Sequence, residues 1–178
     1  MAPDVWLRPI TEADLDLIEM LYEDPAEAGE YGFYGYLNPG VLRRRFAESG
    51  LIGDHGGRLA VIAGEAGTAG TLAGEVSWHQ VQTGPTSHCW NIGIGLLERA
   101  RGRGYGTRAQ RLIAEYLFAH TQVNRVEAET ETGNLAEQRA LEKAGFTREG
   151  VRRGSIFRDG RWRDMVAYSM IRSDLGAG

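Results

Sequence analysis

The residues best suited to chemistry form a short loop of glycines and arginines. Its members are Arg101, Gly102, Arg103, Gly104, Tyr105, Gly106 and Thr107. Glycine lets a backbone approach a ligand closely, and the N–H groups at a helix start converge on an anion. A helical pattern begins at Thr107, so the helix dipole adds about half a positive charge there. The loop therefore predicts a phosphate-binding site, to which Arg101 and Arg103 add charge.

Two familiar phosphate loops do not match this stretch. A nucleotide P-loop needs a Lys-Ser or Lys-Thr pair after its last glycine, and none is present. A dinucleotide fingerprint fails because Thr107 stands where a third glycine would follow Gly102 and Gly104. An ordinary glycine turn with solvated arginines remains an alternative. The pattern that does fit is R-x-x-G-x-G followed by threonine.

The loop joins a predicted strand to a predicted helix. In residues 90–96, apolar side chains, including Ile94 and Leu96, alternate with small or polar ones, as in a strand with one buried face. After the loop, apolar residues recur at helical spacing up to about His120. The loop is thus the turn between a strand and a helix.

The rest of the chain alternates strands and helices. Strands are predicted near residues 5–10, 59–63, 71–82, 125–130, 146–157 and 162–171, with Asp159-Gly160 as a hairpin turn. Helices are predicted after the capping residues Thr11, Asn38-Pro39 and Asn134. The order β-α-α-β-β-β-α-β-α-β-β indicates an α/β (α+β) fold with a mixed sheet and helices on its faces.

Length and composition are those of a globular protein. The chain has 178 residues, of which 42% are hydrophobic and 25% charged. We expect residues 1–175 to form one domain and residues 176–178 a flexible tail. Cys89, the single cysteine, cannot form an internal disulfide, and its apolar neighbours indicate a buried, inert thiol. No signal-peptide pattern or membrane-length apolar stretch is visible, so we expect a cytoplasmic protein.

Charge is distributed unevenly along the chain. Residues 1–98 carry 14 acidic and 5 basic side chains, a net of −9, whereas residues 99–178 carry 10 acidic and 15 basic, a net of +5. A basic second half suits a phosphorylated ligand and an acidic first half suits a cationic one, although solvated surface charge explains the pattern equally well. The total of −4 argues against nucleic acid as a partner.

An aromatic, glycine-rich loop lies between residues 29 and 38. Its rings belong to Tyr31, Phe33, Tyr34 and Tyr36. Such a segment can form a lid or wall over a substrate, and it can equally be a loop packed onto the core. Acidic residues at positions 23, 24, 27 and 30, together with exposed rings, would favour a cationic amine, partly through cation–π contact.

Two motifs together resemble the GNAT acyltransferase superfamily. One is the R-x-x-G-x-G loop, and the other is the helix N-x-x-x-x-x-x-L-E-K-A-G-F at residues 134–146. The ending E-G-V-R-R-G…G-R-W-R-D-M-V-A-Y-S-M is similar to the Rim-type branch, which includes N-terminal protein and small-amine acetyltransferases. The resemblance implies one mixed, largely antiparallel twisted sheet of about seven strands with helices on both faces.

The same resemblance implies acetyl-coenzyme A as cosubstrate, with no metal. The amides of residues 101–107 would hold the pyrophosphate, and the strand around Ile94 and Leu96 would bond the pantetheine arm. Asn134 would contact that arm, or be only a helix cap. Arg139 or Lys143 would reach the 3′-phosphate, or lie on a solvated helix face. A homodimer is also consistent with the family.

The familiar catalytic residues are missing. Many relatives have a glutamate as general base where this chain has Asn91, and an amide cannot accept a proton at neutral pH. Many have a tyrosine as general acid where this chain has Leu141, and some Rim-type relatives have a serine where it has Glu137. A thiol with a pKa of about 8.5 leaves readily without strong acid help.

Without a strong base, weakly basic acceptors are favoured. Deprotonation at pH 7 costs about 4.6 kcal/mol for a lysine-like amine and about 1 kcal/mol for an α-amino group. The estimate favours a peptide N-terminus, an amino sugar or an amino acid, whereas the acidic first half favours polycations. Glu75 or His79 could instead act as base through a water.

The sequence therefore predicts an acetyl-coenzyme A-dependent N-acetyltransferase. A primary amine, either a small molecule or a peptide N-terminus, would attack the thioester directly, with neither nucleic acid nor membrane as partner. Two alternatives stay open: a coenzyme A-binding sensor or partner protein with impaired catalysis, suggested by Asn91 and Leu141, and an enzyme that uses a longer acyl donor.

Overall fold

The computed structural model describes residues 4–36, 38, 40–65 and 67–176. Its strands are β1 (Asp4–Pro9), β2 (Ile52–Gly53), β3 (Gly56–Gly64), β4 (Thr71–Gly84), β5 (Ser87–Leu96), β6 (Arg125–Glu131), β7 (Thr147–Arg158) and β8 (Arg161–Ile171). Its helices are α1 (Leu15–Glu23), α2 (Pro25–Ala28), α3 (Val41–Ser49), α4 (Tyr105–His120) and α5 (Leu135–Ala144). Short 3-10 turns are η1 (Glu12–Asp14), η2 (Glu98–Ala100) and η3 (Arg172–Gly176).

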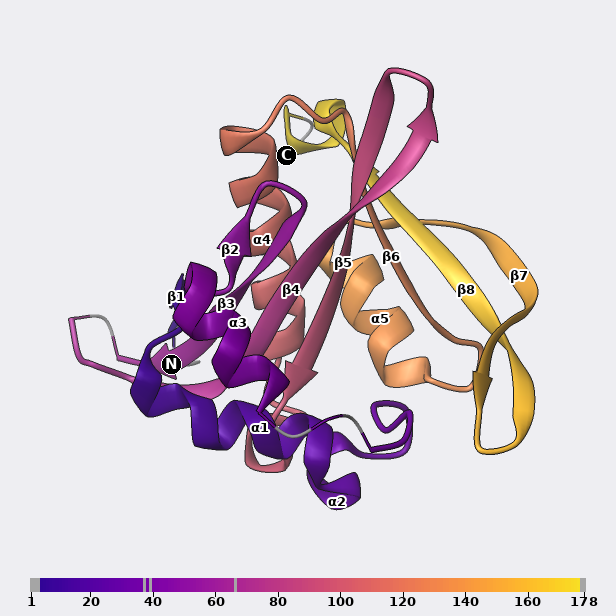
Figure 1. The fold of residues 1–178 in the computed structure, drawn as a ribbon. Helices are drawn as coiled ribbons and strands as arrows, with labels where there is room; N and C mark the ends of the chain where they lie inside the picture. The colour runs from indigo at the N-terminus through magenta and orange to yellow at the C-terminus, as the bar shows by residue number, and fades with distance from the viewer. Residues whose placement is uncertain (1–3, 37, 39, 66, 177–178) are drawn as a thin grey trace.

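The strands of the described residues form a single sheet. Their order is β1-β3-β4-β5-β6-β8-β7, and β2 pairs with β3 outside this path (Figure 1). The pair β5–β6 is parallel and the other pairs are antiparallel. The predicted mixed, largely antiparallel sheet is therefore confirmed. It has eight strands rather than about seven, because the two-residue β2 is too short to leave a sequence pattern.

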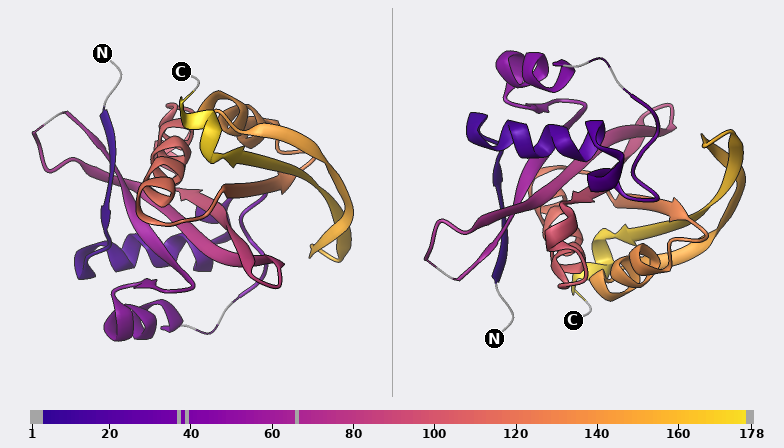
Figure 2. Two further views of the ribbon diagram at one scale, coloured as in Figure 1. Left: turned by 90° about the horizontal axis from the view of Figure 1, so that it is seen from above. Right: turned by 90° about the horizontal axis from the view of Figure 1, so that it is seen from below.

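Helices cover both faces of the sheet, as predicted. Figure 2 shows α4 and α5 on one face and α1 and α3 on the other. The alternation in β3 explains this: Leu59 and Val61 pack in the core with α4, whereas Ala60 and Ile62 pack in the core with α1. Burial of both faces makes β3 a nearly continuous apolar run.

The two parallel strands separate halfway along their length. β5 pairs with β6 at Trp90–Val126, Asn91–Glu127 and Ile92–Ala128. Beyond these pairs, residues 93–96 of β5 pair with β4, and β6 continues against β8. Figure 1 shows the two strands diverging towards their carboxyl ends. The divergence leaves one edge of β5 without a strand partner among the described residues.

Several element boundaries differ from the prediction. α4 begins at Tyr105 rather than Thr107, because Gly104 in the left-handed region (φ +81°) is its N-cap. α3 is capped by Gly40 (φ +75°) rather than by Asn38-Pro39, and Pro39 lies outside the described residues. The short helix α2 was not foreseen after Pro25. Of the predicted tail, Gly176 belongs to η3, and residues 177–178 are not described.

The predicted hairpin turn between β7 and β8 is confirmed. Asp159 and Gly160 have positive φ angles of 49° and 71°, and Arg158 pairs with Arg161 across the turn. Two left-handed residues match the right-handed twist of the flanking strands, which explains the Asp-Gly pair. This hairpin carries several of the site residues described below. None of the described helices is long and apolar enough to cross a membrane.

Candidate active site

The glycine loop presents unpaired backbone N–H groups at the start of α4. Those of Gly102, Arg103 and Gly104 have no hydrogen-bond partner among the described residues. The first N–H groups of α4 follow them, and these lack an intrahelical acceptor in any α-helix. A Cβ added at Gly102 or Gly104 would meet no atom within 4 Å, so the space beside the loop is open. The arrangement is that of an anion-binding helix start.

Arg101 has a different role in the structure from the predicted phosphate contact. Its N–H donates to the Glu98 carbonyl at 3.1 Å, and its side-chain Nε donates to the Leu96 carbonyl at 3.0 Å. The guanidinium also donates to the Glu27 carbonyl in α2. The side chain therefore ties α2 to the end of β5 and points away from the loop amides. Arg103 is exposed and remains available to an anion.

Ile94 and Leu96 lie in the divergent half of β5. A Cβ added at Gly106 in α4 would lie 3.6 Å from Leu96 Cδ1 and 3.9 Å from Ile94 Cδ1, so both side chains face α4. Their backbones form the free edge of β5 opposite β6. The open edge and the loop amides are thus neighbours, and binding of a pantetheine arm at Ile94 and Leu96 stays a prediction.

Asn134 is confirmed as the N-cap of α5. Its Oδ1 accepts from the Glu137 N–H at 3.3 Å, and its Nδ2 donates to Thr130 Oγ1 in β6 at 3.0 Å. This side chain therefore joins α5 to the strand that borders the gap. Arg139 and Lys143 are exposed and form no ion pair with the described residues. Their contact with a phosphate stays a prediction.

The structure separates the two proposed bases, Glu75 and His79. Glu75 lies opposite Gly95, level with the gap, whereas His79 is exposed and lies opposite Asn91, where β5 and β6 are still paired. Asn91 itself is partly buried beside Glu127. Of the two candidates, Glu75 is the one level with the opening.

Glu75 is almost completely buried beneath α1. Only 1% of its surface is exposed, and one carboxylate oxygen contacts the Arg58 guanidinium, which also bonds the Tyr22 hydroxyl. The other oxygen has no hydrogen-bond partner among the described residues. Burial raises the pKa of Glu75 to about 8, while the adjacent guanidinium favours the ionised form. Glu75 as general base stays a prediction.

A second carboxyl with a raised pKa stands on the other side of the gap. Glu137 lies in the first turn of α5, where burial raises its pKa to about 7 and the nearby Gln110 amide opposes that shift. Gln110 is 2% exposed, and its Nε2 has no hydrogen-bond partner of good geometry among the described residues. Sequence reasoning noticed Glu137 only as a departure from the family pattern, because its burial depends on α4.

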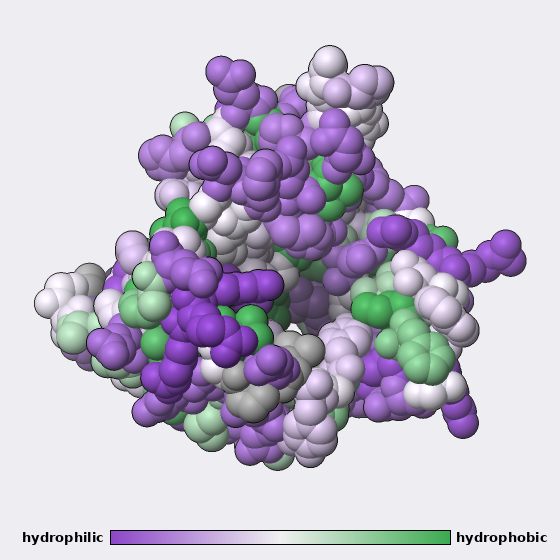
Figure 3. Space-filling model, in the orientation of Figure 1, coloured by the Kyte–Doolittle hydropathy of each residue, from purple (hydrophilic) through white to green (hydrophobic). Residues whose placement is uncertain are grey.

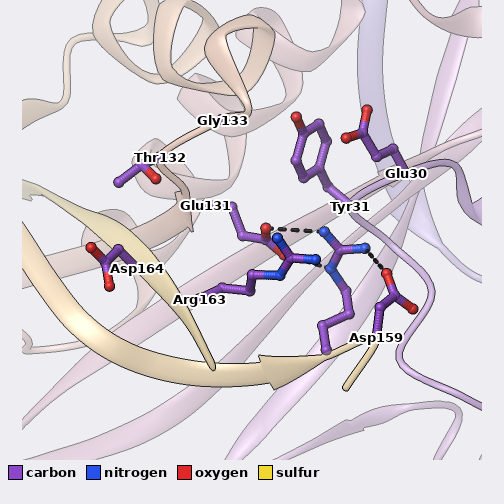
Figure 4. Close-up of a pocket in the computed structure, with 9 residues that line it drawn as sticks. Glu30, Tyr31, Glu131, Thr132, Gly133, Asp159, Arg163 and Asp164 are labelled. Carbon is purple, nitrogen blue, oxygen red and sulfur yellow. Dashed lines mark hydrogen bonds and ion pairs between the residues drawn. The ribbon is translucent and has the colours of Figure 1, made fainter. Parts of the chain in front are cut away.

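A cleft of about 380 Å³ opens at the carboxyl end of β6. Figure 3 shows the surface hollowed between the N-terminal helices and the β7–β8 side, and Figure 4 shows the side chains within. Its lining residues are Glu30, Tyr31, Glu131, Thr132, Gly133, Arg158, Asp159, Arg163 and Asp164. Sequence reasoning linked only Tyr31 and Glu30 of these to a substrate, because the others come from segments that the fold alone brings together.

The aromatic loop contributes to this cleft unequally. The Arg158 guanidinium lies over the Tyr31 ring at 5.6 Å from its centroid, and Phe33 lines an adjoining hollow of about 390 Å³. Tyr34 and Tyr36 are 52% and 80% exposed, and the Tyr36 ring packs edge-on against Phe33 at 5.3 Å. The loop is therefore a wall of the cleft at Tyr31 and a solvent-exposed surface at Tyr34 and Tyr36.

The lone cysteine is inert, as predicted. Cys89 is 1% exposed, and its burial raises the pKa of the thiol to about 11. A thiol with such a pKa carries almost no thiolate at neutral pH, so it is a poor nucleophile.

The diverging parallel strands and the helix start with its free amides are the features by which the fold class can be compared with known proteins. The match to known proteins identifies this class. Residues 4–147 match the family model of the acetyltransferase (GNAT) domain. The chain therefore belongs to the GNAT acetyltransferase family, as the two sequence motifs predicted.

Relatives and solved structures agree with this assignment. A probable N-acetyltransferase YjcK of Bacillus subtilis is 35% identical over 58% of this chain and 56% of its own length, so the match spans little more than half of that protein. A putative ribosomal N-acetyltransferase YdaF of the same organism is 27% identical over 89% of this chain and 85% of its own. The name of the second relative agrees with the predicted Rim-type branch.

The fold itself has close counterparts. A spermidine N-acetyltransferase of Vibrio cholerae, solved with CoA and spermine, superposes with a TM-score of 0.77 over 96% of both chains, at 17% identity. At this identity the likeness concerns the fold alone. It confirms the predicted fold class.

Proposed function

We propose that this protein transfers the acetyl group of acetyl-coenzyme A to a primary amine within a single domain. The observation that carries the proposal is the juxtaposition of the free amides at residues 102–107 with the open edge of β5. The first feature fits a pyrophosphate, and the second fits an extended amide-containing arm that adds as a strand. The CoA-bound relative in the comparison supports the same cosubstrate.

In this proposal the cosubstrate binds on the α4 side of the sheet and the acceptor amine on the opposite face. The α4 loop would hold the diphosphate, Ile94 and Leu96 would bond the arm, and Asn134 would fix α5 beside it. In the reaction the amine nitrogen forms a bond to the thioester carbon, the C–S bond breaks, and the thiolate takes up a proton. A backbone N–H of residues 90–97 would stabilise the developing oxyanion.

The acceptor would enter from the face that carries Glu75. That side chain, Asn91 and the charged cleft all project from the face opposite α4. A weakly basic amine, such as a peptide N-terminus or an amino acid, needs the least help from a base, since an α-amino group costs only about 1 kcal/mol to deprotonate at pH 7. The acceptor class is developed in the next subsection.

Binding of the cosubstrate is tested by Gly104→Ala, with Gly67→Ala as matched control. Both glycines have nearly equal positive φ angles, 81° and 83°, and neither has an atom within 4 Å of an added Cβ. Both variants therefore carry the same backbone strain. We expect only Gly104→Ala to weaken CoA binding in calorimetry, by about tenfold or more. Equal affinities would remove the loop from the proposal.

Catalysis is tested by incubation with labelled acetyl-coenzyme A and a broad panel of primary amines. Transfer of label to any amine supports an enzyme. One observation favours the rival function of a CoA-binding sensor: Leu141, at the position of the usual tyrosine acid, is fully buried in the core. Tight binding without transfer to any amine would support that rival.

A further inference from the structure

The cleft at the carboxyl end of β6 contains a guanidinium that forms no ion pair with the described residues. Two arginines and four carboxylates line it, from the segment after α2, the end of β6 and the β7–β8 hairpin. It lies on the face of the sheet that we assign to the acceptor, so the inference drawn from it rests on the proposed function.

Arg158 pairs with carboxylates through all three of its guanidinium nitrogens. Its Nε and one terminal nitrogen donate to the two Glu131 oxygens at 2.5 and 3.0 Å, and its other terminal nitrogen donates to Asp159 at 2.7 Å. The Arg158 and Glu131 side chains are only 6% and 7% exposed. Both Glu131 oxygens are used in this bidentate pair, so Glu131 has little capacity left for another cation.

Arg163 has no such partner. Its side chain forms no ion pair or hydrogen bond with the described residues, and its Nε is buried without an acceptor. Figure 4 shows its guanidinium inside the cleft, on the same side as the Glu131 carboxylate. One oxygen of the neighbouring Asp164 is already bonded, because its Oδ1 accepts from the Gly154 N–H at 2.8 Å. The Arg163 guanidinium can therefore donate two parallel hydrogen bonds to an anion with two oxygens, such as a carboxylate or a phosphate.

Of the four lining carboxylates, Glu131 and Asp159 pair with Arg158, and one oxygen of Asp164 accepts from a backbone N–H. Glu30 forms no ion pair with the described residues, and it stands beside Tyr31 on the opposite wall from Arg163 (Figure 4). The cleft therefore offers a free cation on the β8 side and a free anion on the α2 side. A ligand that complements the cleft therefore carries both a positive and a negative charge.

We propose that Arg163 binds an anionic group, a carboxylate or a phosphate, of the amine acceptor. The acceptor would be an amine that also bears an acidic group, such as an amino acid or a peptide whose N-terminal residues include one. Its amino group would lie towards the gap between β5 and β6, while its acidic group pairs with Arg163 through two parallel N–H···O bonds.

Matched acceptors test this without any variant. Acetylation is measured for glutamate against glutamine, for phosphoethanolamine against ethanolamine, and for peptides beginning with Asp against those beginning with Asn. We expect kcat/KM to be at least about tenfold higher for the acidic member of a pair, the effect of one charge-assisted hydrogen bond. Comparing the free amino acids with the peptides also shows whether the enzyme accepts the carboxylate of a free amino acid or that of a peptide side chain.

Variants assign the preference to one residue. Arg163→Met should abolish the preference chiefly through KM, and Arg163→Lys should restore part of it. Arg161→Met is the matched control, because Arg161 is exposed two residues away in the same strand and does not line the cleft. Thermal unfolding of each variant checks that it is folded.

The outcomes separate this inference from the proposed function. Acetylation of neutral amines or spermidine as fast as of acidic ones by the wild type overturns the Arg163 site and leaves the acetyltransferase intact. A preference that persists in Arg163→Met also overturns it. Absence of transfer to every amine overturns the proposed function itself.

Discussion

At the scale of single residues, two carboxyls on opposite faces of the sheet have raised pKa values, one fully buried (Glu75) and one partly buried (Glu137). Burial raises the pKa of Glu75 to about 8 and that of Glu137 to about 7. Glu75 lies beneath α1, on the acceptor side, and Glu137 lies between α4 and α5, on the cofactor side. Paired carboxyls with perturbed pKa values beside a binding gap are typical of acid–base chemistry, and ion-pair networks produce them too.

The first prediction concerns Glu75 as base. A base acts when deprotonated, so kcat with an amine that is already neutral at pH 6 should rise with pH through about 8. Glu75→Gln should remove this rise, and His79→Gln should keep it, because His79 lies where β5 and β6 are still paired. The measurement is kcat from pH 6 to 9.5. Identical profiles for wild type and Glu75→Gln would remove Glu75 from the mechanism.

The second prediction concerns Glu137 and stability. In the folded protein its pKa rises from 4.5 to about 7, so the folded state keeps a proton that the unfolded chain releases. The stabilisation is complete below about pH 4.5 and is lost as pH rises to about 7, by about 1–2 kcal/mol after allowance for partial exposure.

Glu137→Gln should flatten that part of the pH dependence. Urea unfolding at pH 5 and pH 8 measures it, and the slope that remains belongs chiefly to Glu75. Glu115→Gln is the control, because the Glu115 side chain is 40% exposed on the surface of α4. An unchanged slope in Glu137→Gln would mean that this carboxyl ionises normally.

At the scale of elements, α2 is attached to the cofactor loop by two reciprocal contacts. Arg101 donates from the loop side to the Glu27 carbonyl, and the Glu27 carboxylate accepts from the Glu98 N–H at 2.9 Å. Arg101 also occupies the space that a side chain at Gly29 would need, since an added Cβ would lie 2.8 Å from its Nη1. Because Tyr31 follows directly after α2, the contacts connect the acceptor wall to the cofactor loop.

The third prediction is that Arg101→Met raises the KM for both acetyl-coenzyme A and the amine, each by about tenfold. The variant loses the side-chain hydrogen bonds of Arg101, which are worth about 1 kcal/mol apiece. Arg103→Met is the matched control: it removes the same charge from the same loop without touching α2, so it should raise only the KM for acetyl-coenzyme A. Steady-state kinetics with both substrates varied gives the two constants. An unchanged amine KM in Arg101→Met would contradict the connection.

Local signals explain which elements could be predicted. Asp159-Gly160 and Asn134 act through their own backbone or the next three residues, and both predictions are confirmed. The start of α3 was misplaced because Gly40 adopts a left-handed conformation that competes with an Asn-Pro cap. The start of α4 was placed two residues late for the same reason at Gly104. Glycine adopts both signs of φ readily, so the pattern alone could not choose.

At the scale of the whole molecule, the acidic and basic halves of the chain meet in one cleft. Glu30 and Tyr31 from the first half face Arg158 and Arg163 from the second. The division of charge along the sequence therefore does not correspond to a division in space, and the preference for a polycation that it suggested does not follow from it.

The fourth prediction concerns global stability in acid. Asp14 accepts from the Arg8 guanidinium and from the Thr11 N–H, which hold its pKa near 2 rather than 3.8. This stabilisation is present above about pH 3.8 and is lost as pH falls through about 2. Asp14→Asn should lower the free energy of unfolding at pH 7 by about 1–2 kcal/mol and weaken its decline in acid.

Urea unfolding between pH 2.5 and 7 measures this effect. Asp16→Asn is the control, because the Asp16 side chain is 87% exposed although it also pairs with an arginine. A change within about 0.5 kcal/mol is expected there. Equal effects at the two positions would show that burial of Asp14 adds nothing to the ion pair.

The sequence by itself determined the family, the order of the longer elements and the position of the glycine loop between a strand and a helix. These features follow from local sequence patterns, since strand alternation, helix caps and the glycine loop depend on neighbours within a few residues. The sequence also showed that Asn91 and Leu141 stand where many relatives have a catalytic glutamate and tyrosine, because those positions lie at fixed distances from the motifs.

Only the tertiary structure decided the acceptor cleft, the burial of Glu75 and Glu137, and the use of Arg101. Each depends on contacts between segments far apart in the chain: Glu131 with Arg158, Glu75 with Arg58 and Tyr22, Arg101 with Glu27. The charge state and availability of a polar side chain follow from what is packed against it, and no local pattern records that. This is why Arg163, one of many arginines in the sequence, becomes distinctive only in the folded protein.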